Sequence, residues 1–587
     1  MMRKLIRKQL SWQVASMHAL FGVFFVMAFY LYKERLFVDC GYYIFYAIND
    51  QFFRVDHHRY VLAISQLLPL IGMYAGAGLK SILITYSLSH VLFYYVLFLI
   101  VEYRFNDLGA GAAILLIQTI GQLYLYFSPM LEICYGAGLL IPFYVLLNRT
   151  DRNRWHWFWL IFLEFMILTS HPENFIIFFF VVAMHMLQNG FQRKLHPTLV
   201  VLFFVLMIIK IFSFSEYESN KVNYMMKQDE NKLYQNFFSP DYVKGILHVL
   251  YAYFWELVVF FFITAVVLLK EKKWKQFLLF VSTVVGTIVL INVTNYANEF
   301  SRYRESLYNP LVPVIVIGFI HFFYNHISSL WKKVAFVLLL CMIVNRIFLI
   351  YEYSKPFTQR IAQMENIILH ARQNVGSKFM VNLENCERKN WQLNWSYPLE
   401  TIMLSSLEKG SKTICVATDE DMQNIKASLP VNEQTSIITR WDIRYDTSFN
   451  NTYFNLEHGN YIALTTTDTL VNSETYDGNI FLTAPKTLLL EKNNVVYVPV
   501  NMINSSGAPL YSGKGNAIFL TYHWIEKNSG GMRKGIRTPL EVDVTGEYRQ
   551  VMEVKTPDES GEYLLVVDLV IHDRRLNINA GSEVEIY

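Results

Sequence analysis

Charged side chains are scarce in this sequence. Lys, Arg, Asp and Glu together make up 17% of its 587 residues, against about 25% in typical soluble domains. Hydrophobic residues make up 53%, which is more apolar surface than one soluble domain could hide. A purely soluble protein is therefore excluded. The formal net charge of +3 gives no indication of nucleic-acid binding.

Cysteine is also rare, with five residues and no CxxC pair. This excludes a disulfide scaffold and zinc-finger spacing, and we expect the cysteines to be incidental. The one disulfide that we consider joins Cys386 and Cys415 in the C-terminal part. No small-residue cleavage site follows the basic start Met1–Leu10, which predicts an uncleaved first membrane span rather than a signal peptide.

What the sequence has in abundance is long apolar runs, which continue to about Tyr351. A membrane-spanning helix needs about 20 mostly apolar residues. Eleven runs are clear candidates: 11–32, 81–101, 108–127, 131–148, 155–170, 175–188, 197–214, 245–269, 275–292, 311–326 and 333–351. The predicted fold is a polytopic α-helical membrane domain over 1–351.

One further run, 60–77, contains Gln66, Pro69 and two glycines, and whether it crosses decides the side of every later loop. If it lies along the surface as an amphipathic helix, the basic loops fall on the cytoplasmic side, as the positive-inside rule requires. If it crosses, the strongest basic clusters move outside. We therefore predict about 11 spans, a cytoplasmic N-terminus and a C-terminal part on the other side. Lys33 and Arg35 are the exceptions to this pattern.

Two acidic residues stand on the predicted outer face among apolar neighbours. Asp39 follows the first run, and Glu132 opens the fourth. Asp39 could take a proton from an attacking hydroxyl, or it could be a solvated interfacial acid. Two acids on one face could share a substrate or a metal ion, so a divalent metal is left open.

Basic and polar residues accompany these acids. His57, His58 and Arg59 open the amphipathic run, where they could meet phosphate or form an interfacial cluster in which the basic side chains reach toward water. His171 and Glu173 form another polar turn, which a capped helix break around Pro172 would also explain.

The last outer loop carries Arg302, Tyr303 and Arg304, on the side that the positive-inside rule disfavours. Arginine makes bidentate contacts with phosphate, so the loop suggests an anionic ligand. The alternative is that the two arginines pair with Glu299 and Glu305.

In this order of features the chain resembles the GT-C superfamily of polyprenyl-phosphate-sugar-dependent membrane glycosyltransferases. Asp39 matches the acid of the first outer loop, His57–Arg59 the start of a juxtamembrane helix, Glu132 the second acid, and Arg302–Pro310 the late Arg-Tyr loop. The resemblance covers roughly residues 1–350 and is one of layout. The chain departs from the family pattern in having a single Asp before Cys40 and Glu as its second acid.

The resemblance implies a mechanism. Asp39 would be the general base in an inverting transfer, and Glu132 would orient the acceptor or bind an ion. The donor phosphate would be held by Arg302, Arg304, His58 and Arg59, with substrate contacts from the remaining polar candidates, His57, His171, Glu173 and Tyr303.

The C-terminal part reads as water-soluble. We predict a mixed α/β region over 352–487 and an antiparallel β-sandwich over 488–587. The second stretch resembles a bacterial immunoglobulin-like module, with Tyr522-His-Trp524 and Gly561–Val570 as its most characteristic segments. Tyr522 and Trp524 are expected in its core. The bacterial likeness implies a cytoplasmic (inner) membrane location, with the C-terminal part periplasmic or extracellular.

The leading hypothesis is a glycosyltransferase that moves a sugar from a polyprenyl-phosphate-linked donor to a glycan, lipid or protein acceptor at the outer face. An oligosaccharyltransferase or glycan ligase is the alternative within that class. A glycolipid transporter or flippase and a membrane scaffold are the alternatives outside it. The absence of an obvious repeat between the two halves counts against a transporter.

Overall fold

The computed structural model describes residues 11–128, 132–150, 152–216, 218–220, 223, 240–294, 301–381, 394–408, 410–426, 431–464, 480–505, 510, 518–571, 574–575 and 580–587, and within these not the side chains of 240–242, 293–294, 301–304, 394, 426, 571, 574–575 and 580. The chain divides into two compact units. The first comprises 1–357, 393–413 and 444–456, and the second comprises 358–392, 414–443 and 457–587.

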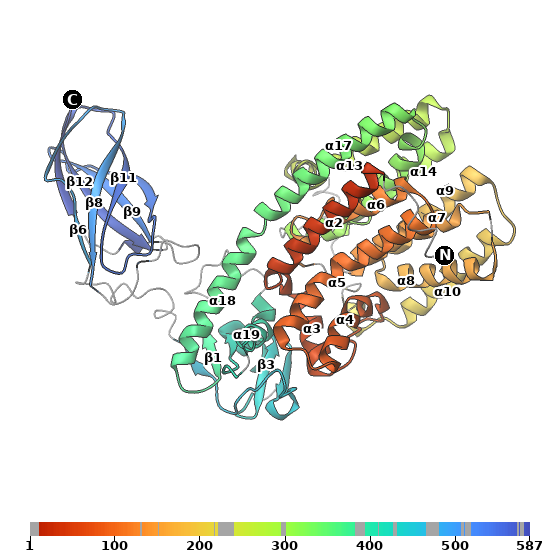
Figure 1. Cartoon of the computed structure of the whole chain (residues 1–587), viewed down its shortest axis with the longest axis horizontal. Helices are drawn as coiled ribbons and strands as arrows, with labels where there is room; N and C mark the ends of the chain where they lie inside the picture. The colour runs from red at the N-terminus through yellow and green to blue at the C-terminus, as the bar shows by residue number, and fades with distance from the viewer. Residues whose placement is uncertain are drawn as a thin grey trace. The chain divides into compact units, whose positions relative to one another are not determined.

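The first unit is helical (Figure 1). Its principal elements are α2 (Trp12–Tyr30), α3 (Asp39–Asn49), α4 (Ala63–Tyr74), α5 (Leu79–Leu99), α6 (Leu108–Thr119), α7 (Glu132–Leu147), α8 (Arg154–Ser170), α9 (Asn174–Asn189), α10 (Leu195–Phe212), α13 (Pro240–Lys270), α14 (Trp274–Thr294), α15 (Ser301–Tyr308), α16 (Leu311–Gly318), α17 (Ser329–Glu352) and α19 (Tyr397–Ser405). Short helical turns join them, including η1 (Glu34–Leu36), η2 (Tyr60–Leu62), η4 (Leu125–Phe127), η5 (Phe319–Tyr324) and η8 (Asn394–Ser396).

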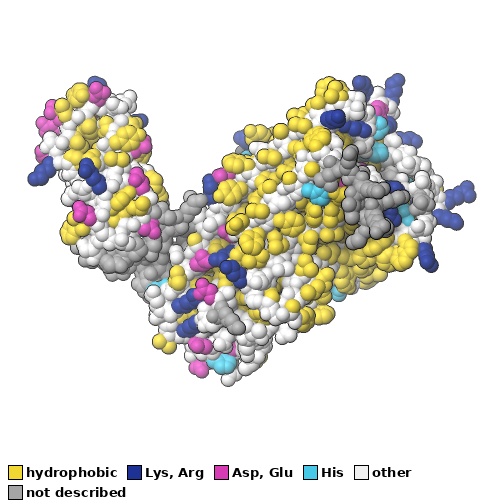
Figure 2. Space-filling model, viewed as in Figure 1, with side chains coloured by type: hydrophobic (Ala, Val, Ile, Leu, Met, Phe, Trp, Pro, Cys, Tyr) yellow, Lys and Arg dark blue, Asp and Glu magenta, His cyan; other side chains and the backbone are white. Residues whose placement is uncertain are grey.

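Each of the eleven predicted apolar runs contains helix, although in the run 108–127 helix α6 already ends at Thr119. Seven helices in the described part of the chain are long and apolar enough to cross a membrane. Their outward side chains are apolar. Val201, Leu278 and Leu338, on three different helices, are each more than 60% exposed. Water would disfavour such a surface, whereas lipid would cover it. Figure 2 shows hydrophobic side chains along the helical unit and Lys and Arg gathered at one of its ends.

Helix α4, in the run 60–77, has 12 residues, too few to cross a bilayer. It turns its polar side inward, where the Gln66 amide accepts from the backbone N–H of Arg54 at 2.7 Å and donates to its carbonyl at 2.8 Å. Its exposed side chains are apolar, with Leu67 49% and Ile71 54% exposed. This is the reverse of a water-exposed helix, and it suits an interfacial position.

Arg35, one of the two exceptions to the positive-inside pattern, is a buried structural residue. It is 2% exposed and donates to the carbonyl of Tyr126 at 2.6 Å. Its guanidinium carbon lies 4.1 Å from the centroid of the Tyr126 ring. The side chain therefore joins the segment after α2 to the segment after α6.

Two segments from the C-terminal half return to the helical unit and pack on α3. In the first, α19 contacts α3 directly, and the two helices lie beside each other in Figure 1. In the second, Asn450 donates to the carbonyl of Ile48 at 3.0 Å, and its backbone N–H donates to the Asn49 side chain at 3.0 Å. The predicted boundary at 351 thus does not separate all later residues from the helical domain.

The second unit contains the larger part of α18 (Lys355–Gln373) and a small parallel sheet in the order β2-β1-β5. These strands are β1 (Lys378–Val381), β2 (Cys415–Thr418) and β5 (Ile462–Ala463). Helix α20 (Asp419–Lys426) follows β2, and β3 (Thr435–Thr439) pairs with β4 (Asp442–Tyr445). Cys415 is buried, and its thiol lies 3.4 Å from the carbonyl oxygen of Ile437; Cys386 lies outside the described residues.

The end of the chain is a β-sandwich. One sheet has the order β10-β9-β12-β14-β7 and the other β11-β8-β6. Their bounds are β6 (Ile480–Thr483), β7 (Thr487–Leu490), β8 (Val495–Asn504), β9 (Ile518–Glu526), β10 (Met532–Pro539), β11 (Glu547–Lys555), β12 (Gly561–Ile571) and β14 (Ala580–Ile586); β13 (Arg574–Arg575) pairs with β12. Strands β6 and β7 start before the boundary predicted at Leu488, because β6 pairs with β8 and contributes Ile480 to the core.

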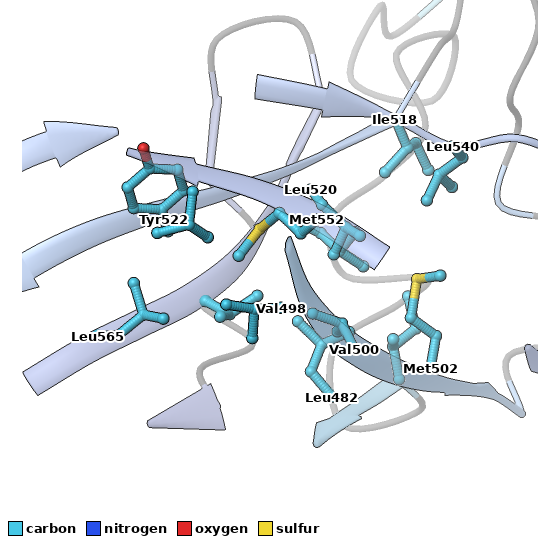
Figure 3. Packing of buried hydrophobic residues seen from close by; sticks show 14 of the residues in the cluster. Leu482, Val498, Val500, Met502, Ile518, Leu520, Tyr522, Leu540, Met552 and Leu565 are labelled. Carbon is cyan, nitrogen blue, oxygen red and sulfur yellow. The ribbon is translucent and has the colours of Figure 1, made fainter. Parts of the chain in front are cut away.

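Side chains from both sheets form the sandwich core (Figure 3). Tyr522 and Trp524 are 1% and 3% exposed, which confirms their predicted core position. Both side chains bind the backbone of Lys555. The Trp524 Nε1 donates to the Lys555 carbonyl at 3.0 Å, and the Lys555 N–H donates to the Tyr522 hydroxyl at 2.7 Å. These rings are therefore not available as a sugar-stacking platform.

Candidate functional site

Asp39 is the first residue of α3, and a strained turn places it there. The preceding residue, Val38, has φ 56° and ψ −112°. A β-branched side chain at positive φ is a genuine outlier, and such strain persists only where surrounding contacts impose it. The Asp39 side chain is partly exposed while its neighbours Val38 and Cys40 are buried.

The contact that imposes the turn comes from α19. The Glu400 carboxylate accepts from the backbone N–H of Val38 at 3.1 Å and also from the Ser396 hydroxyl. Glu400 is 2% exposed. A hydrogen bond to a buried charged group stabilises a structure more than one between neutral groups, so Glu400 fixes the backbone at Asp39.

Gly41 allows the chain to pack this tightly. A Cβ at this position would lie 2.4 Å from the Leu36 carbonyl oxygen and within 3.3 Å of Leu399 and Met403 on α19. The glycine in the sequence Asp39-Cys-Gly-Tyr-Tyr is therefore required by close packing against both the preceding turn and α19.

Asp39 is brought near charged residues of the following loop. Burial raises the pKa of Tyr43 most, and the negative charges of Asp39 and Asp56 raise it further, while Arg59 lowers it. The charges of Asp39 and Arg59, predicted as base and phosphate ligand, thus act on the same buried tyrosine.

Arg59 and Glu132, predicted for separate roles, form an ion pair with each other. The same arginine lies 3.4 Å from a carboxylate oxygen of Glu218, which is 2.8 Å from the Lys210 ammonium. Each of these four side chains is at most 11% exposed. The alternating charges form a buried chain, here called the ionic chain, that balances two positive with two negative groups.

The pKa of Glu218 shows how strongly the charges of the ionic chain act on one another. Burial alone would raise the pKa of Glu218, but the hydrogen bond from Lys210 and the charges of Lys210 and Arg59 outweigh it, so the pKa is lowered. The carboxylate is therefore held in its ionised form. Because two carboxylates already balance Arg59, this residue is less available to a phosphate than the sequence suggested.

His57 and His58 occupy a left-handed turn, with φ of 54° and 57°. The His57 Nδ1 lies 2.8 Å from the Ser215 hydroxyl, and its carbonyl accepts from Lys210 at 2.7 Å. Burial, followed by the charge of Arg59, lowers the pKa of His57. His58 is exposed, so of the two histidines it is the one accessible to a ligand.

Arg302, Tyr303 and Arg304 lie on α15, but their side chains are outside what the structure describes. Glu305, offered as a partner of the arginines, has another role in the described part of the molecule. Its carboxylate accepts from the backbone N–H groups of Leu123, Tyr124 and Leu125 at 2.8–3.0 Å. This buried contact fixes α15 to the segment that leads into Glu132.

His171 and Glu173 lie between α8 and α9. The backbone N–H of Glu173 donates to the His171 Nδ1 at 3.4 Å, which is a local turn contact. This geometry fits the capped helix break that the sequence offered as the alternative for these two residues.

Three of the residues that build the site were not predicted from the sequence: Lys210, Glu218 and Glu400. Glu305 was predicted only as a partner of the arginines. A signal was present for Lys210, because it is the only charged residue in the run 197–214 and intramembrane charges are functional or paired by default. Glu400 carried no signal, because it lies in a soluble stretch whose return to α3 is not encoded locally.

Among the described residues there is no group of three or more His, Cys, Asp or Glu side chains placed to hold a metal ion. Comparison of the chain with known protein families, curated proteins and solved structures finds no match.

Proposed function

We propose that this chain is a membrane glycosyltransferase that uses a polyprenyl-phosphate-linked sugar and works on the non-cytoplasmic side. The proposed topology has about 11 spans, with the N-terminus in the cytoplasm and α3, α4 and α19 outside. Support comes from the basic end of the helical unit and from α4, whose exposed apolar side suits the membrane surface.

The observation that carries the proposal is the position of Asp39. A partly exposed carboxylate begins α3 on a strained turn, held by buried Glu400. Strain fixed by such contacts clusters at functional sites, and a general base must be held in a defined geometry. The basic residues expected to bind the leaving phosphate lie in two segments of the helical unit. The ionic chain holds the segment of His58 and Arg59. Glu305 holds helix α15, which carries Arg302 and Arg304.

In the proposed reaction Asp39 takes the proton from an acceptor hydroxyl as its oxygen attacks the anomeric carbon. The new glycosidic C–O bond forms while the bond from that carbon to the phosphate oxygen breaks, with inversion. The electron pair leaves with the polyprenyl phosphate. Arg302, Arg304 and the accessible His58 would stabilise the growing negative charge, with a smaller part for Arg59.

Glu132 has a positioning role in this account, because its carboxylate holds Arg59. No step of the proposed reaction depends on a divalent metal. Transfer of a whole glycan by a ligase would use the same groups and differs only in the mass that is moved.

The proposal is tested on cells lacking the protein. Their surface glycans are compared by mass spectrometry after rescue with wild type, Asp39→Asn, Arg302→Ala or the surface variant Asp558→Asn at matched membrane levels. The proposal expects a missing mass that wild type and Asp558→Asn restore and Asp39→Asn does not. Full rescue by both Asp39→Asn and Arg302→Ala would favour a transporter or scaffold.

A further inference from the structure

A second cluster of polar and aromatic side chains lies on α3 beyond Asp39. It comprises Tyr42, Tyr46, Asp50, Arg54, Asp56, Trp395 and Arg444, here called the α3 patch, all from the helical unit. The sequence analysis assigned no role to any of them. Tyr42 and Trp395 are partly exposed, and their ring centroids are 6.2 Å apart at an interplanar angle of 69°.

The charges of the patch are paired. Arg444 binds Asp50 with both of its terminal nitrogens, at 2.6 and 3.0 Å. Arg54 lies 2.8 Å from Asp56 and donates to the Tyr42 hydroxyl at 2.7 Å. Both pairs are partly exposed, between 19% and 35%, so their remaining donors and acceptors can be reached from solvent.

The two arginines are also ordered by one ring. Their guanidinium carbons lie 4.7 Å (Arg54) and 4.6 Å (Arg444) from the centroid of Tyr46, which is itself 1% exposed. Cation–π contacts of this length hold a guanidinium plane in place. The patch is therefore a preorganised surface, which reduces the entropy lost when a ligand binds.

This chemistry fits a neutral carbohydrate. The patch is balanced at two positive and two negative charges, so it offers no net attraction to a phosphate or to an acidic or basic peptide. Aromatic faces take the apolar C–H faces of a sugar ring. Planar Arg–Asp pairs supply neighbouring donors and acceptors for its hydroxyls, which must be hydrogen-bonded when they are buried.

The position on α3 relates the patch to the reaction. Tyr42 and Tyr46 follow Asp39 by three and seven residues and so lie on the same helix face. Seven residues correspond to about 10 Å along the axis. A ligand on the patch would place neighbouring sugar units there, while its terminal hydroxyl reaches Asp39.

We propose that the α3 patch binds a neutral glycan as the acceptor, with sugar rings against Tyr42 and Trp395 and hydroxyls on the Arg54–Asp56 and Arg444–Asp50 pairs. This assignment rests on the proposed function, because the bound glycan is an acceptor only if the protein is a transferase. Binding of the glycan can be measured without any transfer.

The test uses the full-length protein in lipid nanodiscs. The probe is carbohydrate released by mild acid from the envelope of cells that lack the protein, separated into neutral and acidic fractions. Binding is followed by saturation-transfer NMR and titration. The variants are Tyr42→Ala, Trp395→Ala and Arg444→Gln, with Tyr42→Phe and Trp395→Phe as ring-retaining partners. Tyr497→Ala, which removes an exposed aromatic residue of the sandwich, is the control.

We expect wild type to bind a component of the neutral fraction, and each Ala variant to bind it about tenfold more weakly. Tyr497→Ala should bind as wild type does, and Tyr42→Phe and Trp395→Phe, which keep an aromatic ring, should bind more tightly than the Ala variants. Binding that the Ala and Arg444→Gln variants leave unchanged would overturn the assignment, as would binding of the acidic fraction alone or of neither fraction. Arg444→Gln and Trp395→Ala still decide the matter if Tyr42→Ala does not fold.

The two proposals fail in different ways. If Asp39→Asn transfers sugar normally while the Ala variants lose binding, the catalytic assignment is wrong and the glycan site stands. If Asp39→Asn is inactive and the Ala variants bind normally, the transferase stands and the acceptor lies elsewhere.

Discussion

Glu400 Oε1 accepts a hydrogen bond from the backbone N–H of Val38 at 3.1 Å, across 362 residues of sequence. The contact joins a carboxylate from the part of the sequence predicted to be water-soluble to the turn that precedes Asp39. It stabilises a backbone conformation that valine disfavours. The account therefore treats Glu400 as a positioning residue, which acts on the reaction through Asp39.

Removal of this carboxylate should reduce activity more than it reduces substrate binding. Glu400→Ala leaves the Val38 N–H without its acceptor, a cost of about 1–3 kcal/mol, and lets the turn relax. We expect kcat to fall with little change in KM. Glu400→Gln keeps an acceptor oxygen for the same N–H and should recover most of the activity. Equal kcat values for Glu400→Ala and wild type would contradict a positioning role.

Gly41→Ala tests the close packing around the same turn. The new Cβ would meet the Leu36 carbonyl, a backbone atom that cannot rotate away, so we expect a loss of about 1–3 kcal/mol or more and a lower midpoint of thermal unfolding in detergent. Gly22→Ala is the matched control, because nothing lies within 4 Å of its Cβ. The interpretation fails if both alanines are tolerated equally.

Loss of a charge from the buried ionic chain should destabilise the protein more than loss of a charge from an exposed ion pair. Arg59→Ala leaves Glu132 and Glu218 buried without their shared partner, and breaking such a pair costs about 3–5 kcal/mol. Arg533→Ala removes an arginine from the exposed ion pairs of the sandwich, and solvent screening should leave stability almost unchanged. Thermal unfolding of the two variants measures the difference, and similar losses would contradict the buried chain.

Stability should depend on pH through His57. Its pKa is lowered in the folded protein, by burial first and then by Arg59, whereas the unfolded chain takes up a proton near pH 6.5. The unfolded state then binds more protons in this range, so stability is full above about pH 6.5 and falls as the pH drops toward the folded pKa. Unfolding of wild type and His57→Gln between these limits tests this, since the variant should lose less stability on acidification. An identical fall in both would show that other groups cause it.

The sequence was sufficient where a pattern repeats along the chain. Apolar runs located the long helices of 1–351, although α18 lies outside them, and the segments Tyr522–Trp524 and Gly561–Val570 located β9 and β12 of the sandwich. Pro69, Gln66 and the loop charges indicated a surface position for α4, and its 12-residue length and inward polar side agree with that position. Each of these features is determined by the order of residues within one short stretch of the chain.

The pairing within the site could not be read from the sequence. Glu132 and Arg59 were treated as separate groups because nothing along the chain shows that α7 begins beside the turn before η2. The same is true of Glu305, whose carboxylate binds three backbone amides of another loop. Backbone acceptors and donors have no residue signature, so such contacts follow only from the tertiary fold.

The most direct test of the central claim is sugar transfer by the purified protein. Wild type, Asp39→Asn and Asp558→Asn are added at equal amounts to membranes from cells that lack the protein. Mass spectrometry then follows release of free polyprenyl phosphate and the mass of the surface glycan. The account predicts release and a gain of sugar mass with wild type and Asp558→Asn, and neither with Asp39→Asn. Release and mass gain at the wild-type rate with Asp39→Asn would contradict it.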